Sequence, residues 1–247
     1  MLAVALNGGL GNQLFQLAAA ETIASETGRT FCVTDTISPI TVHTDRNYFS
    51  SVLADWATRP RLPPAEMNAE ETSFEKQEWS TLPQVKSICM HGYFQNWRYV
   101  PSGFVERLRL PECPPLNGAF IHIRGGDYVN NPFHDVGLHK GYYRRALTYF
   151  PPGTHFYVFT NDITYAKRFS FLLEVPHTFV DADEVNSLAQ MGACTLGGIC
   201  ANSSFSWWGA YLNPNRTIVM PDKWFNDPKL YTDGYYFPGV RKCMVLI

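Results

Sequence analysis

Residues 6–17 read LNGGLGNQLFQL, a glycine turn followed by an apolar run, and the class of fold follows from what flanks it. The apolar residues 3–6 before the turn predict a short strand, and residues 13–27 place apolar side chains on one helical face. Gly28 suits the end of that helix, and residues 30–34 favour a strand. The order strand, turn, helix, strand predicts a βαβ unit and an α/β fold.

The rest of the chain continues this alternation of strands and helices. The expected strands are residues 85–93, 119–124, 155–160, 177–180, 198–201 and 217–220. The expected helices are residues 48–56, 70–79, 140–149, 164–172, 184–194 and 206–212. The proline cluster LPECPPL at residues 110–116 is the best candidate linker. We therefore expect two Rossmann-type domains, residues 1–115 and 116–247.

Composition narrows the class of protein. The 247 residues are 45% hydrophobic, enough to bury a sizeable core, and the formal net charge of -2 gives no sign of nucleic-acid binding. The amino terminus has no basic segment, and residues 7–9 interrupt its apolar stretch, so we expect no secretion signal. No apolar run reaches the roughly 18 residues of a membrane span. We expect a soluble, cytoplasmic protein with six reduced, mostly buried cysteines.

Polar residues gather where the predicted strands end. They are Asn7, His122, Arg124, Thr160, Asn161, Asp162, Asp181, Asp183, Asn202, Ser203, Ser204 and Asp222. Ligands of open α/β sheets bind beyond the carboxyl ends of the strands, so this distribution indicates a shared binding cleft.

The strand in AFIHIRGGDY, residues 119–128, is the most informative of these. Period-two alternation places His122 and Arg124 on one face near the end of the strand. The planar fork of an arginine suits a pair of phosphate oxygens, and the two glycines that follow allow a ligand to approach the backbone closely. The alternative to phosphate binding is that Arg124 forms an ion pair with Asp127 and has a structural role only.

The stretch CANSSFSWWGAYLNP, which begins at Cys200, places small hydroxyl residues between a strand and a short helix. Backbone N–H groups at a helix amino terminus, together with the hydroxyls of Ser203 and Ser204, form an anion site. The alternative is an ordinary helix cap by either serine. We expect Trp207 and Trp208 to pack in the core.

Four motifs, NGGLGNQLFQLA, HGYFQN, IHIRGGDYV and ANSSFSWWGAYLN, occur in this order in α-1,2-fucosyltransferases, glycosyltransferase family 11. The chain resembles that family from about residue 7 to residue 222, and more distantly resembles α-1,6- and protein O-fucosyltransferases. The resemblance implies a GT-B-like fold of two Rossmann-type domains facing across a cleft, with residues 1–115 as the acceptor-side domain and residues 116–247 as the domain that binds the nucleotide-sugar donor. It also implies inverting transfer of fucose from GDP-fucose to a sugar hydroxyl of a glycan in α-1,2 linkage, without a metal or other cofactor.

The resemblance also assigns roles to residues. Those expected to bind the donor are Gly9, Gly11, Asn12, Gln13, His122, Arg124, Asn202, Ser203, Ser204 and Phe205. Arg124 would stabilise the departing diphosphate, and the glycine turn would face the donor from the amino-terminal domain. Asp127 is the first candidate for a general base and His134 the second.

The sequence departs from the family pattern at two places. The family usually has a second arginine where this chain has Gly125. Family members often carry an acidic residue, suited to guanine, at the place of Ser187 or Leu188. The second departure weakens the assignment of guanine as the base of the donor.

Other functions compete with this interpretation. The same scaffold could use another nucleotide sugar, or bind sugars without catalysis. The turn and Asp35 imitate a dinucleotide-binding fingerprint, although Leu14 stands where the third glycine belongs. Asp181 and Asp183 imitate the DxD motif of metal-dependent transferases.

Overall fold

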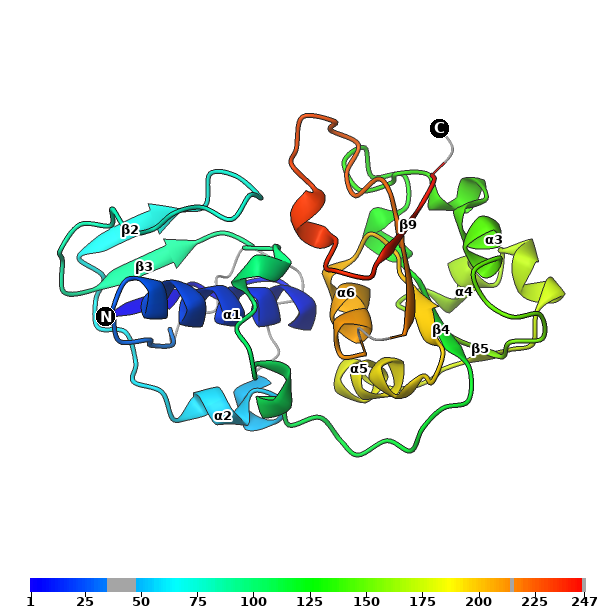
Figure 1. Ribbon diagram of the computed structural model, residues 1–247, viewed down its shortest axis with the longest axis horizontal. Helices are drawn as coiled ribbons and strands as arrows, with labels where there is room; N and C mark the ends of the chain where they lie inside the picture. Colours follow the sequence, from blue (N-terminus) through cyan, green and yellow to red (C-terminus); the bar gives the residue numbers. More distant parts are fainter. Residues whose placement is uncertain (35–47, 214–215, 246–247) are drawn as a thin grey trace. The chain divides into compact units, whose positions relative to one another are not determined.

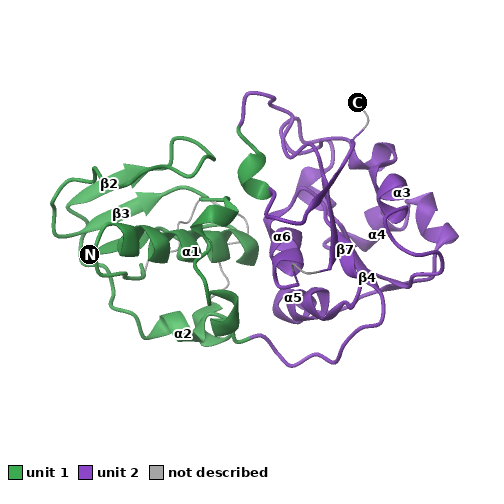
Figure 2. Ribbon diagram, viewed as in Figure 1, with its two compact units in different colours: residues 1–109, 231–235 green, residues 110–230, 236–247 purple. Residues whose placement is uncertain are grey.

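The computed structural model describes residues 1–34, 48–213 and 216–245, and the chain divides into two compact units (Figure 2). Unit 1 is Met1–Arg109 with Tyr231–Tyr235, and unit 2 is Leu110–Leu230 with Tyr236–Ile247. The first division falls at the start of the proline cluster, and the chain later returns to unit 1 for five residues. That return was not predicted from the sequence.

Unit 1 contains a parallel sheet in the order β1-β3-β2, formed by β1 (Leu2–Val4), β3 (Ile88–His91) and β2 (Met67–Glu70). The strand expected at residues 30–34 is present as isolated parallel bridges, one of which joins Phe31 to Leu2. β1 and β3 confirm two expected strands, both shorter than predicted, whereas β2 was missed.

Helix α1 (Leu10–Glu26) follows the glycine turn and packs its apolar face into the core of unit 1. It begins three residues earlier than expected, with Gly9 at the N-cap in an extended conformation. Gly28 lies at φ +63°, which is the left-handed conformation that ends helices and favours glycine. The βαβ opening is therefore present with a fragmentary second strand.

The helix expected at residues 70–79 is wrong. β2 ends at Glu70, and distant side chains then hold the chain in an extended course. The Glu71 carboxylate accepts hydrogen bonds from the backbone N–H groups of Tyr93 and Phe94, at 2.8 and 2.9 Å. The Tyr99 hydroxyl accepts a hydrogen bond from the backbone N–H of Gln77. The Gln77 N–H, which a helix would have paired with a nearby carbonyl, is therefore satisfied by a residue distant in sequence. The remaining short elements of unit 1 are η1 (Tyr48–Ser50), α2 (Ala54–Ala57), η2 (Trp97–Tyr99), η3 (Val105–Arg107) and η7 (Asp233–Tyr235).

Unit 2 contains a six-stranded parallel sheet in the order β6-β5-β4-β7-β8-β9. The strands are β4 (Ala119–Ile123), β5 (Phe156–Thr160), β6 (His177–Phe179), β7 (Gly197–Ile199), β8 (Thr217–Pro221) and β9 (Arg241–Cys243). The chain builds outward from β4 to one edge, then returns to β7 and builds to the other edge. This is the doubly wound Rossmann order, and its topological switch point lies between β4 and β7.

The helices of unit 2 cover both faces of this sheet, with α3 and α4 on one side and α5 and α6 on the other (Figure 1). The long helices are α5 (Glu184–Ala193) and α6 (Ser204–Tyr211). The shorter elements are η4 (Gly126–Tyr128), η5 (Leu138–Lys140), α3 (Tyr142–Leu147), α4 (Ile163–Ala166) and η6 (Ser170–Glu174). The single helix expected at residues 164–172 is therefore split in two. All five strands expected in this half of the chain are confirmed, as β4 to β8, whereas β9 was not predicted.

The core confirms two further expectations. Trp207 and Trp208 are fully buried, and all six cysteines are free, five of them buried. In the three described ranges of the chain, no helix combines the length and the apolar character needed to cross a membrane.

Candidate functional site

The candidate site of unit 2 lies at the switch point of its sheet. His122 belongs to β4 and Arg124 follows it, while Asn202 and Ser203 follow β7, the strand hydrogen-bonded to β4. Parallel strands end at the same edge, so these residues, far apart in the sequence, meet where α/β sheets bind ligands. The structure therefore brings the two most informative motifs together.

His122 is buried, and its Nδ1 atom has no hydrogen-bond partner among the described residues. Burial, reinforced by the nearby Arg124 cation, lowers the pKa of His122 from 6.5 to about 3. Its ring lies 5.8 Å from the Phe205 ring, between ring centroids. A neutral imidazole with a free nitrogen therefore lies beside the first turn of α6.

The Arg124 side chain is 18% exposed and is held on two sides. One terminal nitrogen donates to Asp127 Oδ1 at 2.7 Å, and the guanidinium carbon lies 4.8 Å from the centre of the Tyr128 ring. The Nε atom is buried with no hydrogen-bond partner in the described part of the chain. The ion pair expected as the structural alternative is thus present, but it engages part of the guanidinium only. The Asp127 side chain is 54% exposed, so its ion pair is open to solvent and an anionic ligand can compete with Asp127 for the Arg124 guanidinium.

An aromatic stack continues from Arg124 through Tyr128 to His134. The rings of Tyr128 and His134 are stacked at 4.4 Å and 14°, and Phe225 lies 5.8 Å from His134. Burial lowers the pKa of His134, so its imidazole is neutral at pH 7. The sequence analysis missed Tyr128 and Phe225, because neither has a local signal apart from its aromatic character.

Asn202 has a structural role in this arrangement. Its Nδ2 atom donates to the backbone carbonyls of His134 and Trp224, at 2.9 Å each. These bonds tie the loop that carries His134 to the strand end that carries the two serines. A direct contact between Asn202 and the donor stays a prediction.

Helix α6 begins at Ser204, with Ser203 in the N-cap position. Ser203 is buried, yet its side chain makes no capping hydrogen bond. The alternative of an ordinary side-chain cap by Ser203 therefore does not describe this helix start. The arrangement suits an anion site, because the first backbone N–H groups of a helix favour a negative ligand.

Gly125 occupies the place of the second family arginine, and its surroundings explain the departure. Its backbone N–H donates to Asn161 Oδ1 at 2.9 Å. A β-carbon at this position would lie 2.7 Å from Cβ of Asp162 and 2.9 Å from Cδ1 of Tyr165. Asp162 caps α4 through a hydrogen bond from the N–H of Tyr165, so it cannot move freely.

We expect Gly125→Arg to lower the free energy of unfolding by about 1–3 kcal/mol, because a side chain there overpacks the start of α4. Denaturant unfolding measures the change. Gly9→Ala is the matched control, because a β-carbon at Gly9 meets no atom within 4 Å in the structure. An arginine variant as stable as the wild type would contradict this explanation.

The two positions of α5 where the family often has an acidic residue hold Ser187 and Leu188. Ser187 donates its hydroxyl to the carbonyl of Ala182, and Leu188 is fully buried. Asp183 caps α5 and accepts two hydrogen bonds from Asn186, at 2.8 Å each. Within residues 1–34, 48–213 and 216–245, no group of three or more His, Cys, Asp or Glu side chains is placed to hold a metal ion.

In unit 1, the glycine turn is braced by amide side chains. Gln13 is buried and donates to the carbonyl of Gly8 at 3.0 Å. Gln16 accepts from the N–H of Asn7 and donates to the carbonyl of Gly92 in the HGYFQN motif. Gln13 therefore shapes the turn, and its expected contact with the donor stays a prediction.

Asn12 is positioned by a buried relay of side chains. Gln95 donates to Asn12 Oδ1 at 2.7 Å and accepts from the hydroxyl of Tyr235 at 2.7 Å. Tyr235 belongs to the five residues that return to unit 1, and its neighbour Gly234 packs against Asn96. Gly11 is buried in α1, whereas Gly9 borders open space. The sequence analysis identified HGYFQN as a motif but not this function for it. Asp35 lies outside the described residues.

The strand order of unit 2 defines a doubly wound α/β protein, with its motif residues at the topological switch point. Residues 116–238 match the model of glycosyl transferase family 11. The resemblance that the four motifs indicated is thereby confirmed for nearly all of unit 2.

Two curated relatives come from Escherichia coli. The O-antigen biosynthesis glycosyltransferase WbnK is 35% identical over 139 residues, which are 50% of this chain and 45% of the relative. An alpha-1,2-colitosyltransferase is 31% identical over 126 residues, which are 46% of this chain and 43% of the relative. The chain thus matches less than half the length of each.

Solved structures extend the likeness to both units. The NodZ alpha-1,6-fucosyltransferase soaked with GDP-fucose has a TM-score of 0.53 and 15% identity, over 86% of this chain and 92% of that one. A mutant of Arabidopsis thaliana FUT1 in complex with GDP has a TM-score of 0.50 and 12% identity. The match covers 86% of this chain and 68% of that one. At this identity the likeness shows the fold. The expected α/β, GT-B-like fold class is confirmed, whereas the expected cleft stays a prediction.

Proposed function

We propose that the protein is an inverting glycosyltransferase that transfers L-fucose from GDP-fucose to a sugar hydroxyl in α-1,2 linkage. The observation that carries this proposal is Arg124, fixed at the switch point beside the start of α6, with part of its guanidinium unengaged. The family 11 match supports the reaction, and the α-1,2 linkage in the name of one relative, the colitosyltransferase, supports the linkage.

In the proposed reaction, the acceptor hydroxyl attacks C1 of the fucose as the bond from C1 to the diphosphate oxygen breaks. GDP leaves with the electron pair, and the configuration at C1 inverts. Arg124 and the first N–H groups of α6 stabilise the charge that develops on the diphosphate. The reaction needs no metal in this proposal.

The proton of the acceptor hydroxyl goes to a general base, for which Asp127 remains the first candidate. In the structure its carboxylate is paired with Arg124. A diphosphate that takes over the guanidinium releases that carboxylate beside the reacting groups. His134 is the second candidate, because its imidazole is neutral and its buried Nδ1 has no partner among the described residues.

A second candidate function is the same reaction with another nucleotide sugar. Two observations favour it: α5 presents no carboxylate at Ser187 or Leu188, and one relative is named for the transfer of colitose rather than fucose. This alternative changes the donor and leaves the roles of Arg124 and the α6 start unchanged.

A thermal-shift panel of GDP, UDP, GDP-fucose, GDP-mannose and UDP-sugars tests the proposal. Ligand at 100 times its Kd adds about 2.7 kcal/mol of stability, which raises the Tm by about 5–10 °C for a chain of this size. We expect GDP and GDP-fucose to give this shift. Stabilisation by UDP and not by GDP would contradict the donor. Release of GDP from GDP-fucose, unaffected by EDTA, separates an enzyme without a metal requirement from a non-catalytic binder.

A further inference from the structure

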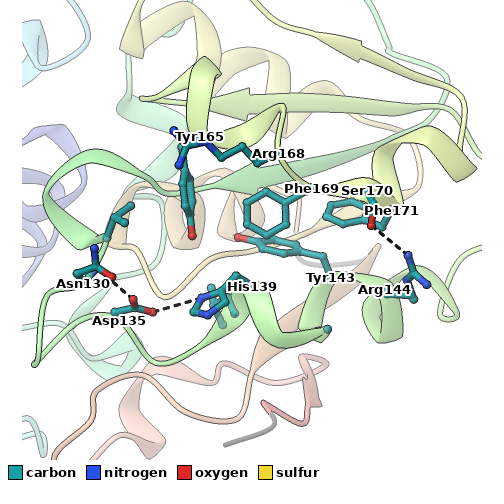
Figure 3. Close-up of a pocket in the computed structure, with 13 residues that line it drawn as sticks. Asn130, Asp135, His139, Tyr143, Arg144, Tyr165, Arg168, Phe169, Ser170 and Phe171 are labelled. Atoms are coloured by element: carbon teal, nitrogen blue, oxygen red, sulfur yellow. Dashed lines mark hydrogen bonds and ion pairs between the residues drawn. The ribbon is translucent and has the colours of Figure 1, made fainter.

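Unit 2 contains a cavity of about 440 Å³ that the proposed donor chemistry does not use (Figure 3). It lies between the loop that follows Tyr128, helix α3 and the segment from α4 to η6. Its volume is within the range of about 300–1,000 Å³ typical of small-molecule sites. Unit 2 therefore holds a pocket of ligand size in addition to Arg124.

One wall of the cavity is aromatic. Phe169 makes edge-to-face contacts with Tyr143 at 5.4 Å and with Tyr165 at 5.3 Å, between ring centroids. Figure 3 shows the Tyr165 ring extending into the space between this wall and Asp135. The C–H groups on one face of a sugar ring are apolar and weakly positive, so they pack well against aromatic rings.

The cavity is also lined by polar side-chain groups that form no hydrogen bond or ion pair within the described residues. Within the described residues, neither the Arg168 guanidinium nor the Tyr165 hydroxyl has a hydrogen-bond or ion-pair partner. The neighbouring Arg144 is different, because Glu174 and Ser170 already engage it. Arg168 and Tyr165 are thus donors available to a ligand.

The balance of charge in the cavity favours a neutral ligand. The Asp135 carboxylate accepts hydrogen bonds from the backbone N–H groups of Asn130 and Gly137, at 3.1 and 3.2 Å, and lies 3.6 Å from Nδ1 of His139. One fixed anion therefore faces the one unengaged guanidinium of Arg168. A diphosphate would lie against Asp135, whereas a sugar uses both groups, as acceptor and donor for its hydroxyls.

The position of the cavity connects it to Arg124. Asp135, His139 and Tyr165 line it, and they also line a small space that Arg124 and His134 border. A sugar in the cavity would therefore lie one side chain away from the guanidinium that holds the diphosphate in the proposed reaction. The geometry points to this cavity as the binding site for a neutral hexose of the acceptor glycan. This inference rests on the proposed function.

Two variants test the site. Tyr165→Phe removes one hydroxyl, and Arg168→Ala removes an exposed side chain with no partner in the described structure. The probes are the methyl glycosides of galactose, glucose and N-acetylglucosamine, with binding followed by saturation-transfer NMR on the whole chain. We expect each variant to weaken binding of the best probe, and to raise its KM in transfer, about tenfold, the effect of one or two lost hydrogen bonds. The KM for the donor stays the same.

Lys167→Ala is the matched control, because Lys167 is an exposed cation next to Arg168 that does not line the cavity. It leaves both KM values unchanged. The site is refuted if no probe binds the wild type, if both variants bind the probe as the wild type does, or if GDP displaces the probe competitively. The proposed function fails separately, when GDP-fucose neither binds nor releases GDP, and the NMR result still decides the cavity in that case.

Discussion

Arg124→Ala reduces sugar transfer by about 10²–10³-fold or more, because it removes a preorganised donor for the departing diphosphate, worth about 3–4 kcal/mol in the transition state. The protein stays folded. The pair with Asp127 is a partly exposed ion pair, of a kind that contributes about 0–1 kcal/mol to stability. Release of GDP in the presence of acceptor measures the rate, and denaturant unfolding measures the stability.

Arg109→Ala is the matched control for this variant. Arg109 pairs with Asp55 through a bond of the same length, 2.7 Å, in unit 1. Its loss removes an Arg–Asp pair without touching the switch point, so transfer continues at the wild-type rate. Arg124→Lys retains the charge but loses the planar fork and recovers part of the rate only. Transfer by Arg124→Ala at near the normal rate would refute the phosphate role.

The elements predicted well are those whose signal is local. The alternation in AFIHIRGGDY predicted β4 and the shared face of His122 and Arg124, and Gly28 marked the end of α1 correctly. The polar strand ends predicted a shared binding cleft, and the doubly wound topology places His122, Arg124, Asn202 and Ser203 at one edge of the sheet. Local pattern thus specified most of unit 2.

The elements predicted badly depend on partners distant in sequence. Residues 71–79 have a helical pattern, but Glu71 and Gln77 bond to residues 93–99, and this tertiary choice overrides propensity. β9 has only three residues, two of them charged, so it becomes a strand only because β8 offers an edge. The same limit applies to the site. Asn202 and Gln95 form hydrogen bonds with residues far away in the sequence, and a local motif cannot predict such partners.

The burial of His122 predicts a pH dependence of stability. Its pKa is about 3 in the folded protein and 6.5 in an exposed chain, so between these values the unfolded state binds more protons. The free energy of unfolding therefore falls as the pH falls from 6.5 toward 3, by about 1.4 kcal/mol per pH unit. The full contribution is present above pH 6.5.

Denaturant unfolding of the wild type and of His122→Gln, from about pH 7 to about pH 4, measures this contribution as a difference in slope. The raised pKa of Glu71 acts in the opposite direction, since its folded state binds the extra proton, but both proteins share it. Equal slopes for the wild type and His122→Gln would show that His122 takes up a proton in the folded state. The imidazole would then be accessible at the switch point as a cation, able to pair directly with a diphosphate.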